Sequence, residues 1–368
     1  MNIGFITTSR ADFGIYLPLL KSIQAEQKMN YLLFVGGMHV MEKYGNSYQS
    51  IKKEGFEITE KLAPLSQGDS PKDIAVSIGG TSKSYGTIWK KYKSKLDLVF
   101  VLGDRYEMFA ATASLIPFNI PIAHIHGGEV TLGATDNKFR NAITSLSDYH
   151  FTSNENHALN VKQITLNNEN IFNVGALGVE AALKSKLINK EEFEKKYNVN
   201  INNGFILTTF HPETVSLNNY TKITELINSF KEIPLKVLCT LPNADTEGGV
   251  IRNELLNYEK ENPTKISCFE NLGQIGYYSA MHYCSIIIGN TSSGIIEAAS
   301  FNKMVINLGE RQKGRLSGKN VIHSPLIKEK IIENFNNFCT KKTISFDNPY
   351  GNKDTSKKII KILQSKIK

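Results

Sequence analysis

Acidic and imidazole side chains follow two short apolar runs of the sequence. Asp104 comes directly after one run, His126 and Glu129 come after the next, and Asp136 lies a little further along the chain. Carboxylates and an imidazole held together in a water-poor site are suited to general acid and base chemistry at carbon. The sequence therefore predicts a proton-transfer site. A helix N-cap is the commoner role for Asp104 or Asp136 taken singly.

Three arginines and a serine- and threonine-rich segment indicate a site for a diphosphate. Arg10, Arg105 and Arg311 lie in expected loops, and guanidinium groups match phosphate oxygens. Residues 289–294 lead from an apolar run into a helix expected to begin near Ile295, where backbone N–H groups and hydroxyls can hold a phosphate. The ordinary alternatives are surface arginines and a Ser/Thr N-cap.

Two further residues have both a functional and a structural interpretation. His211 lies between an apolar run and Pro212, so it could bind a phosphate or carry a proton, or it could be a structural histidine that faces the core. Glu297 could accept hydrogen bonds from ribose hydroxyls, or it could be a solvated acid in the first turn of a helix.

The elements that must position these residues form an α/β pattern. Runs of four or five apolar residues without polar alternation predict parallel strands buried on both faces. Segments such as 15–25 and 70–92 have the length of crossover helices, which predicts doubly wound sheets. Ligands of such sheets bind beyond the carboxyl ends of the strands, where the polar residues above fall. The expected strands are 3–6, 31–35, 98–102, 120–123, 205–208, 235–238, 286–288 and 304–306.

The length predicts two domains. The chain has 368 residues, and single cores stop growing near about 250 to 300. The α/β pattern is interrupted over 174–203 and restarts at Gly204. We therefore expect one Rossmann-like domain over 1–177 with the catalytic acids, and a second over 178–350.

Composition excludes several classes of protein. With 41% hydrophobic residues and a net charge of +8, the chain is globular and not disordered. Residues 341–368 contain eight Lys and two Asp, so this tail carries +6 and the rest of the chain 8 − 6 = +2. The tail pattern is typical of a solvated helix face around an apolar stripe, so we expect no nucleic-acid partner.

Other motifs are missing from the sequence. The four cysteines form no C-x-x-C pair, which indicates neither a zinc site nor a disulfide framework and favours the reducing cytoplasm. The uncharged stretches 108–128 and 271–296 contain Asn and His, and the first also contains Pro, so we expect buried units and no membrane span. Neither G-x-G-x-x-G nor a Walker A motif occurs, so no dinucleotide cofactor is expected.

Taken together, the motifs resemble those of the UDP-N-acetylglucosamine 2-epimerases, and within them the hydrolysing branch of bacterial sialic acid synthesis. Each motif is weak alone, but they run in family order over essentially the whole chain. The matching segments are 9–14, 36–39, 44–46, 103–107, 124–129, 210–214, 243–246, 289–294 with Glu297, and 309–315.

The resemblance implies a GT-B fold, in which two Rossmann-like domains hold the sugar nucleotide between them. Residues 178–350 would bind UDP, and 351–368 would form a helix that packs back on the first domain. It also implies a reaction without metal or cofactor, in which UDP-N-acetylglucosamine and water give N-acetylmannosamine and UDP. A base removes the C2 proton as UDP leaves C1, and the resulting glycal is hydrated with inversion at C2.

The resemblance assigns roles by motif. Asp104 and Asp136 would be catalytic acids or bases, with His211 near the diphosphate or the transferred proton. Many relatives have Glu where this chain has His126, so the second acid or base is either His126 or Glu129. The family also suggests a homodimer or homotetramer. The residues expected to bind the UDP-sugar are Arg10, Asp12, Arg105, Arg140, His211, Asn243, Asp245, Thr291, Ser292, Ser293, Glu297 and Arg311.

Three alternatives remain at this point. The same chemistry could act on UDP-2,4-diacetamido-2,4,6-trideoxyglucose, because changes at C4 and C6 need not alter any motif above. A GT-B glycosyltransferase would use the UDP half of the site but would not need Asp104, His126 and Asp136. A nucleotide-sugar sensor would bind UDP without turnover.

Overall fold

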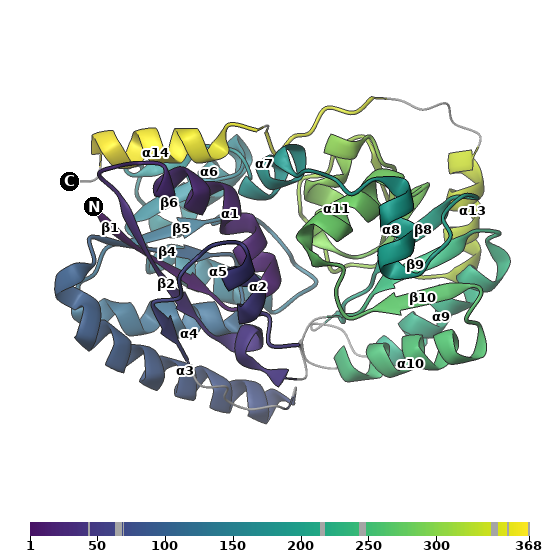
Figure 1. Cartoon of the computed structure of the whole chain (residues 1–368), viewed down its shortest axis with the longest axis horizontal. Helices are drawn as coiled ribbons and strands as arrows, with labels where there is room; N and C mark the ends of the chain where they lie inside the picture. Colours follow the sequence, from purple (N-terminus) through teal and green to yellow (C-terminus); the bar gives the residue numbers. More distant parts are fainter. Residues whose placement is uncertain are drawn as a thin grey trace. The chain divides into compact units, whose positions relative to one another are not determined.

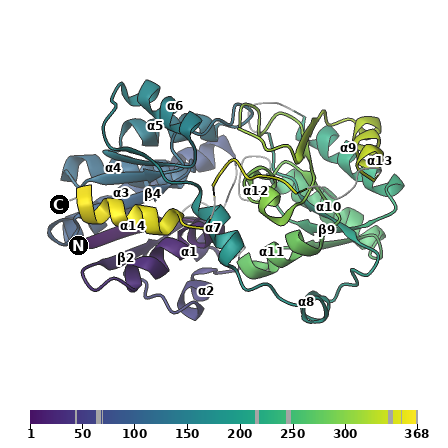
Figure 2. The ribbon, with the colours of Figure 1, turned by 90° about the horizontal axis from the view of Figure 1, so that it is seen from above.

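The structure of the protein is a computed structural model that divides into two compact units, which we describe separately (Figures 1 and 2). Unit 1 comprises Met1–Glu129, Asp136–Ala181 and Tyr350–Lys368, and unit 2 comprises Val130–Thr135 and Ala182–Pro349. The structure describes all residues except Lys43, Tyr44, 63–67, Asp69, 214–217, 243–247, 340–344, Asn352 and 367–368.

Unit 1 contains a parallel seven-stranded sheet in the order β3-β2-β1-β4-β5-β6-β7. The four strands predicted in this region are confirmed. β5 begins two residues later than expected, after Pro121, which has no N–H to donate to the ladder. The strands are β1 (Asn2–Thr7), β2 (Asn30–Val35), β3 (Glu60–Lys61), β4 (Leu98–Leu102), β5 (Ile122–Ile125), β6 (Tyr149–Thr152) and β7 (Ile171–Asn173).

Helices cover both faces of this sheet. Helix α14 lies on one side, packed against α1, while α3 and α4 pack together on the other side (Figure 1). Helix α1 begins at Arg10 and not at residue 15, because Ser9 and Asp12 form a capping box there. The helices are α1 (Arg10–Gln24), α2 (Tyr48–Lys53), α3 (Pro71–Tyr92), α4 (Tyr106–Leu115), α5 (Asp136–Ser145), α6 (Glu155–Thr165), α7 (Leu177–Lys184) and α14 (Thr355–Lys366), with short 3-10 turns η1 (Gly37–Val40), η3 (Lys93–Lys95) and η4 (Ile116–Phe118).

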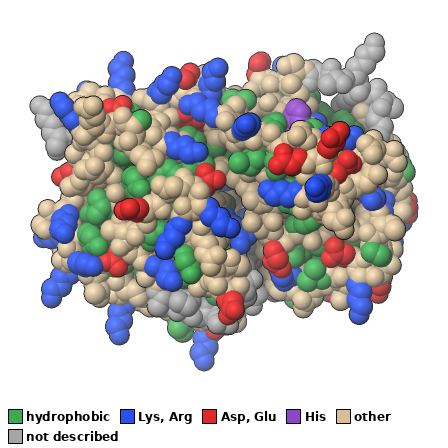
Figure 3. Space-filling model, in the orientation of Figure 1, with side chains coloured by type: hydrophobic (Ala, Val, Ile, Leu, Met, Phe, Trp, Pro, Cys, Tyr) green, Lys and Arg blue, Asp and Glu red, His purple; other side chains and the backbone are tan. Residues whose placement is uncertain are grey.

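A buried carboxylate fixes the start of α14. Glu180 is fully buried and accepts hydrogen bonds from the backbone N of Ser356 at 2.5 Å and from its hydroxyl at 2.6 Å. Ile359 and Leu363 of the same helix belong to the core of unit 1, whereas Lys357 and its neighbouring lysines are exposed. The part of the basic tail that forms α14 is therefore an amphipathic helix, as its pattern predicts. Lys and Arg side chains elsewhere are scattered among acidic ones on the face drawn in Figure 3.

Unit 2 contains a parallel six-stranded sheet in the order β10-β9-β8-β11-β12-β13. The four strands predicted here are also confirmed. Helix α12 begins at Ser292, earlier than the expected start near Ile295. The elements are β8 (Phe205–Thr209), β9 (Lys236–Thr240), β10 (Ile266–Phe269), β11 (Ile286–Gly289), β12 (Val305–Leu308), β13 (Val321–Ser324), α8 (Lys190–Tyr197), α9 (Asn219–Glu232), α10 (Gly248–Glu261), α11 (Gly273–Tyr283), α12 (Ser292–Ile296), η5 (Ala298–Phe301) and α13 (Lys328–Cys339).

The two sheets confirm the predicted class of two doubly wound parallel α/β domains. In each sheet the order in which successive strands are added reverses once, between β1 and β4 in unit 1 and between β8 and β11 in unit 2. Ligands of such folds bind at these switch points. The expected boundary after residue 177 falls inside α7, and unit 1 extends to Ala181. Among the described residues, no helix combines the length and apolarity needed to cross a bilayer.

The buried contacts of Glu180 give a stability prediction. Glu180→Ala leaves the Ser356 donors unsatisfied in the interior, so we expect it to lower the free energy of unfolding by about 1 to 3 kcal/mol. Urea unfolding followed by circular dichroism measures this change. Glu169→Ala, at an exposed site of the same unit, is the matched control. Equal stability of the two variants would show that Glu180 does not anchor α14.

Candidate functional site

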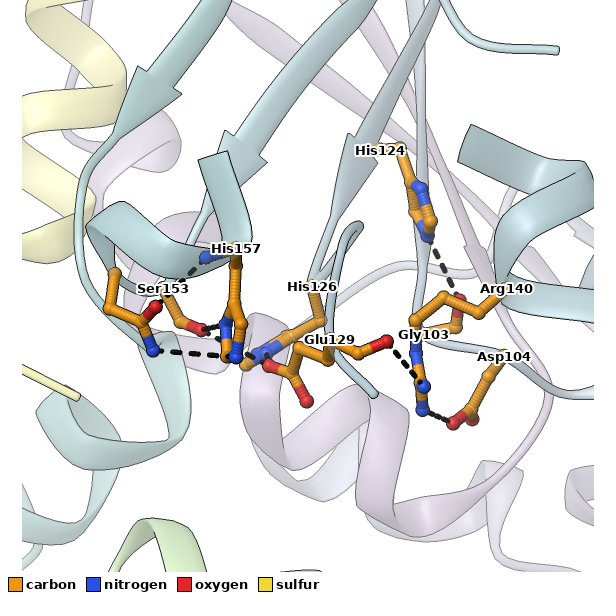
Figure 4. Close-up of polar contacts among 9 residues, drawn as sticks. Gly103, Asp104, His124, His126, Glu129, Arg140, Ser153 and His157 are labelled. Atoms are coloured by element: carbon orange, nitrogen blue, oxygen red, sulfur yellow. Dashed lines mark hydrogen bonds and ion pairs between the residues drawn. The ribbon is translucent and has the colours of Figure 1, made fainter. Parts of the chain in front are cut away.

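The buried Arg140 side chain joins two loops at the carboxyl edge of the unit 1 sheet (Figure 4). Arg140 is 1% exposed and lies on α5. One terminal nitrogen pairs with the carboxylate of Asp104, which follows β4, and Nη1 donates to the carbonyl of Glu129 at 2.9 Å. The sequence assigned Arg140 to substrate binding. Its contacts connect the Asp104 carboxylate with the backbone of Glu129.

His126 and Glu129 form a buried pair beside this guanidinium. Their Nδ1 and Oε1 atoms lie 2.5 Å apart, and the two residues are 6% and 2% exposed. A carboxylate can only accept a hydrogen bond, so Nδ1 of His126 donates. Nε2 of His126 has no hydrogen-bond partner among the described residues. The pair therefore presents an imidazole nitrogen that can accept a proton.

The backbone at His126 is strained. Its φ of +67° lies in the left-handed region, which few non-glycine residues adopt, and its N donates to the carbonyl of Phe151 at 3.3 Å. At Gly128, with φ of +75°, a Cβ would lie 2.2 Å from the carbonyl oxygen of His157. Strain of this kind persists where the surroundings enforce it, and it is common at active sites.

Asp136 occupies the first residue of α5 and is half-buried. It lies four residues before Arg140, so both side chains share one face of the helix. Neither predicted acid is a helix N-cap, because Arg105 takes that position before α4 and Asp136 is already helical. Arg105 donates from Nε and Nη2 to the carboxylate of Glu107 at 3.2 and 3.1 Å, which fixes its orientation.

Asp12 organises the loop after β1. Its Oδ2 accepts from the N and Oγ1 of Thr8 at 2.9 and 2.7 Å and from the N of Ser9 at 3.0 Å. Its Oδ1 accepts from the Ser9 hydroxyl at 2.9 Å. The sequence predicts that Asp12 binds the substrate, and these contacts show that it also shapes the loop. The same loop presents Arg10, whose pKa is lowered from its ordinary value by partial burial.

Buried histidines near these loops are neutral and structural. The ring of His39 contacts Thr7 Oγ1 at 2.9 Å and Ser47 Oγ at 2.8 Å, and burial lowers its pKa to about 4. His124 contacts the carbonyl of Gly103 at 2.9 Å, and burial lowers its pKa to about 3. The sequence predicts no role for either histidine.

Asn290 is the centre of the corresponding site in unit 2. It is fully buried, its Oδ1 accepts from the backbone N of His211 at 2.7 Å, and its Nδ2 donates to the His211 carbonyl at 2.8 Å. Its own carbonyl accepts from Arg311 Nη1 at 3.2 Å and Gln312 Nε2 at 2.8 Å. Asn290 thus brings the predicted His211 and Arg311 together. Asn290 lies in the 289–294 segment, but the sequence predicts no role for this residue.

A second buried side chain fixes the segment before Arg311. Glu213 accepts from the backbone N of Glu310 at 2.7 Å and from Lys222 Nζ at 2.5 Å. At Gly309, with φ of +68°, a Cβ would lie 2.0 Å from a carboxylate oxygen of Glu213. The chain between Glu129 and Asp136 also reaches this segment, because the N of Leu132 donates to the carbonyl of Lys313 at 3.0 Å.

Hydroxyl groups surround the start of α12. Thr291 is its N-cap residue, and its Oγ1 lies 3.2 Å from the Ser293 hydroxyl, which in turn lies 2.6 Å from the hydroxyl of Tyr277. Ser292 is the first helical residue, and the buried Glu297 ends the helix. Burial, and to a lesser degree the charge of Glu297, raises the pKa of Tyr277. This arrangement can accept a phosphate through hydroxyls and backbone N–H groups.

The structure thus groups most of the predicted residues at two sheet edges, one in each unit. The predicted Asn243 and Asp245 lie outside the described residues. No set of three or more His, Cys, Asp or Glu side chains in the described part of the chain is arranged to hold a metal ion.

The sequence of this chain is similar to those of known sugar-nucleotide epimerases. The sequence model of the UDP-N-acetylglucosamine 2-epimerase family matches residues 21–364. The polysialic acid biosynthesis protein P7 of Escherichia coli is 34% identical over 100% of this chain and 94% of its own length. The GDP/UDP-N,N'-diacetylbacillosamine 2-epimerase (hydrolyzing) of Campylobacter jejuni is 32% identical over 88% of this chain and 84% of its own.

A solved structure supports the fold. The UDP-GlcNAc 2-epimerase from Neisseria meningitidis, bound to UDP-GlcNAc, superimposes with a TM-score of 0.81 at 17% identity, covering 99% of this chain and 100% of its own. Together with the two parallel sheets, this likeness confirms the predicted GT-B fold class.

The buried histidines predict how stability depends on pH. Burial lowers the pKa values of His39 and His150 to about 4 and that of His124 to about 3, so in the unfolded chain, with pKa near 6.5, they bind protons that the folded protein does not. Stability is therefore lost as pH falls below about 6.5, by up to about 4 kcal/mol per pH unit for three groups. Urea unfolding between pH 7 and 5 measures the slope.

A matched pair of variants tests the cause. His150→Gln removes one of the three groups and is expected to make the pH dependence shallower by about a third. His323→Gln, at an exposed position, is expected to leave the slope unchanged. A stability that is flat between pH 6.5 and 5 would contradict the interpretation.

Proposed function

This chain belongs to the UDP-N-acetylglucosamine 2-epimerase family, and we propose from this premise that it is a hydrolysing enzyme that converts UDP-N-acetylglucosamine and water to N-acetylmannosamine and UDP. Membership of a UDP-sugar 2-epimerase family rests on the family match and on relatives above 30% identity. The choice of sugar and the individual roles below are the proposal.

The reaction has two stages. In the first, a base takes the proton from C2, the electron pair forms a double bond between C1 and C2, and the bond from C1 to the diphosphate breaks. In the second, water adds its oxygen to C1 and a proton adds to C2 from the opposite face, which gives N-acetylmannosamine. The enzyme therefore needs a proton acceptor, a proton donor and a site for the departing UDP.

The observation that carries the proposal is the buried His126 and Glu129 pair. With Nδ1 donating to Glu129, Nε2 of His126 is the nitrogen able to accept a proton, as removal of the C2 proton requires. Glu129 orients the ring and stabilises the imidazolium that forms. We therefore assign His126 as the acid or base at this position, and Glu129 as its partner.

Asp104 and Asp136 are proposed to act in the second proton transfer, in which a proton is added to C2. Asp104 is 26% exposed at its side chain and lies against the buried Arg140, and Asp136 lies on the Arg140 face of α5. The charge of Arg140 favours the ionised form of a neighbouring carboxyl. Two carboxyls in different environments suit one residue that donates a proton and another that remains charged.

Unit 2 is proposed to hold UDP. The α12 start offers hydroxyls and backbone N–H groups to phosphate, Arg311 adds a guanidinium, and His211 lies on the same Asn290 scaffold. Glu297 is proposed to accept from the ribose hydroxyls. Arg10 and Arg105 of unit 1 are proposed to neutralise the diphosphate as it leaves, and Asn243 and Asp245 keep their expected binding roles.

A second substrate is favoured by a specific observation. The Campylobacter relative is named for hydrolysing epimerisation of a GDP- or UDP-linked N,N'-diacetylbacillosamine, a 2,4-diacetamido sugar. Changes at C4 and C6 leave the proposed chemistry at C1 and C2 intact. The relative from Escherichia coli, named for polysialic acid biosynthesis, supports the N-acetylglucosamine substrate and a role in making sialic acid.

Product analysis in D2O tests the reaction. The protein is incubated separately with UDP-N-acetylglucosamine and with UDP-N,N'-diacetylbacillosamine, and products are followed by NMR. We expect UDP and free N-acetylmannosamine carrying deuterium at C2, because the proton returned to C2 comes from solvent. Turnover of only the diacetamido sugar would identify the second substrate. UDP-N-acetylmannosamine as the accumulating product, or retention of the original C2 proton, would overturn the proposed hydrolytic elimination.

Asp104→Asn tests the role of the acid. The amide keeps the shape of the side chain but cannot exchange a proton, so we expect turnover to fall about 100-fold or more while UDP binding changes little. Turnover is measured by UDP release and binding by calorimetry. Asp97→Asn is the matched control, because Asp97 is exposed and precedes the same strand at its other end. If Asp104→Asn keeps turnover within a few fold of the wild type, Asp104 is structural.

A further inference from the structure

Two buried residues outside the predicted site extend the contacts of Glu129. Ser153 follows β6, His157 lies on α6, and each is 3% exposed. The Ser153 hydroxyl donates to Oε1 of Glu129 at 3.2 Å, the same oxygen that accepts from His126. Nδ1 of His157 lies 2.7 Å from the Ser153 hydroxyl (Figure 4). His126, Glu129, Ser153 and His157 thus form one continuous chain of hydrogen bonds.

The direction of every bond in this chain follows from Glu129. Because a carboxylate only accepts, the single proton of the Ser153 hydroxyl points to Glu129. The Ser153 oxygen must then accept from Nδ1–H of His157. In a neutral imidazole this leaves Nε2 of His157 as an acceptor, and it lies 3.5 Å from the donating Nδ2 of Asn154. His126 and Ser153 therefore donate directly to the Glu129 carboxylate, and His157 donates to Ser153.

Helix α6 fixes the His157 end of this hydrogen-bond chain. Oδ1 of Asn154 caps the helix by accepting from the backbone N of His157 at 3.0 Å. Asn160 of the same helix donates to the carbonyl of Gly128 at 2.8 Å, within the loop that carries His126. The absent side chain of Gly128 allows the His157 backbone to approach. Helix α6 and the loop that carries His126 are thus held against each other on both sides of this hydrogen-bond chain.

We propose that Ser153 and His157 are positioning residues, which orient the Glu129 carboxylate and thereby hold His126 in the tautomer with its proton on Nδ1 and a proton-accepting Nε2. This inference rests on the proposed function for its catalytic consequence. Ser153 and His157 contact Glu129 and each other and need not touch the sugar, so their effect is on the rate of proton transfer and not on binding of the UDP-sugar.

Kinetics of paired variants test the proposal. Ser153→Ala removes the donor to Glu129 and is expected to lower kcat about 10- to 100-fold with KM nearly unchanged, whereas Ser153→Thr keeps the hydroxyl and most of the rate. His157→Asn places an amide donor near Nδ1 and is expected to retain more activity than His157→Ala. Ser229→Ala, which alters a buried serine hydroxyl of unit 2, is the matched control.

A spectroscopic readout separates positioning from loss of structure. In protein labelled with 15N-histidine, NMR shows which ring nitrogen of His126 is protonated, and the spectrum of His126→Asn assigns the signal. Asparagine tolerates the left-handed backbone at this position. We expect a protonated Nδ1 and an unprotonated Nε2 in the wild type, and a mixture of tautomers in Ser153→Ala.

Two results would overturn the inference: a kcat of Ser153→Ala within about twofold of the wild type, or a His126 tautomer that does not change in this variant. The NMR measurement needs no substrate. If the wild type turned over neither UDP-sugar, the proposed function would fail and the tautomer spectra would still decide whether Ser153 and His157 position His126.

Discussion

A guanidinium that is removed from water must be paired, and this constraint organises the carboxyl edge of the unit 1 sheet. Arg140 is almost fully buried and contacts both the Asp104 carboxylate and the Glu129 carbonyl. An unpaired buried charge costs several kcal/mol, so the loops after β4 and β5 are held where they satisfy it. Arg140 therefore fixes the Asp104 carboxylate and the backbone of Glu129, and these two groups in turn stabilise its buried charge.

The parallel sheet explains why these groups meet at all. Neighbouring parallel strands end at the same edge, so Asp104 and His126 come together although 22 positions separate them in the chain. The left-handed backbone at His126 then turns its ring onto Glu129, and Gly128 lets α6 approach closely. A strained turn on a rigid sheet is a common way to hold a reactive group in place.

In unit 2 a neutral side chain, that of Asn290, holds the loops at the carboxyl edge of the sheet. The amide of Asn290 has both a donor and an acceptor, and it uses them on the N and O of His211. The backbone carbonyl of the same residue gathers Arg311 and Gln312. A buried asparagine that satisfies a neighbouring backbone in this way adds no charge near a site proposed to bind a diphosphate.

The sequence by itself determined the fold class and the longer buried strands, and it predicted which residue types lie at the site. Uninterrupted apolar runs such as 98–102 predicted doubly buried parallel strands, and the polar residues after them were therefore expected at sheet edges. The short strands β3, β6, β7, β10 and β13 escaped prediction, because two to four residues with polar members carry little periodic signal.

Only the tertiary structure decided which side chains contact each other, because hydrogen bonds depend on distance and direction, which sequence spacing does not encode. Asp12 and Arg140 are predicted to bind the substrate, and the structure adds that their contacts hold loops. Ser153 and His157 carried no motif, yet they are bonded in a chain to Glu129. The sequence shows which chemical groups are available, whereas the hydrogen bonds between them form only when the chain folds.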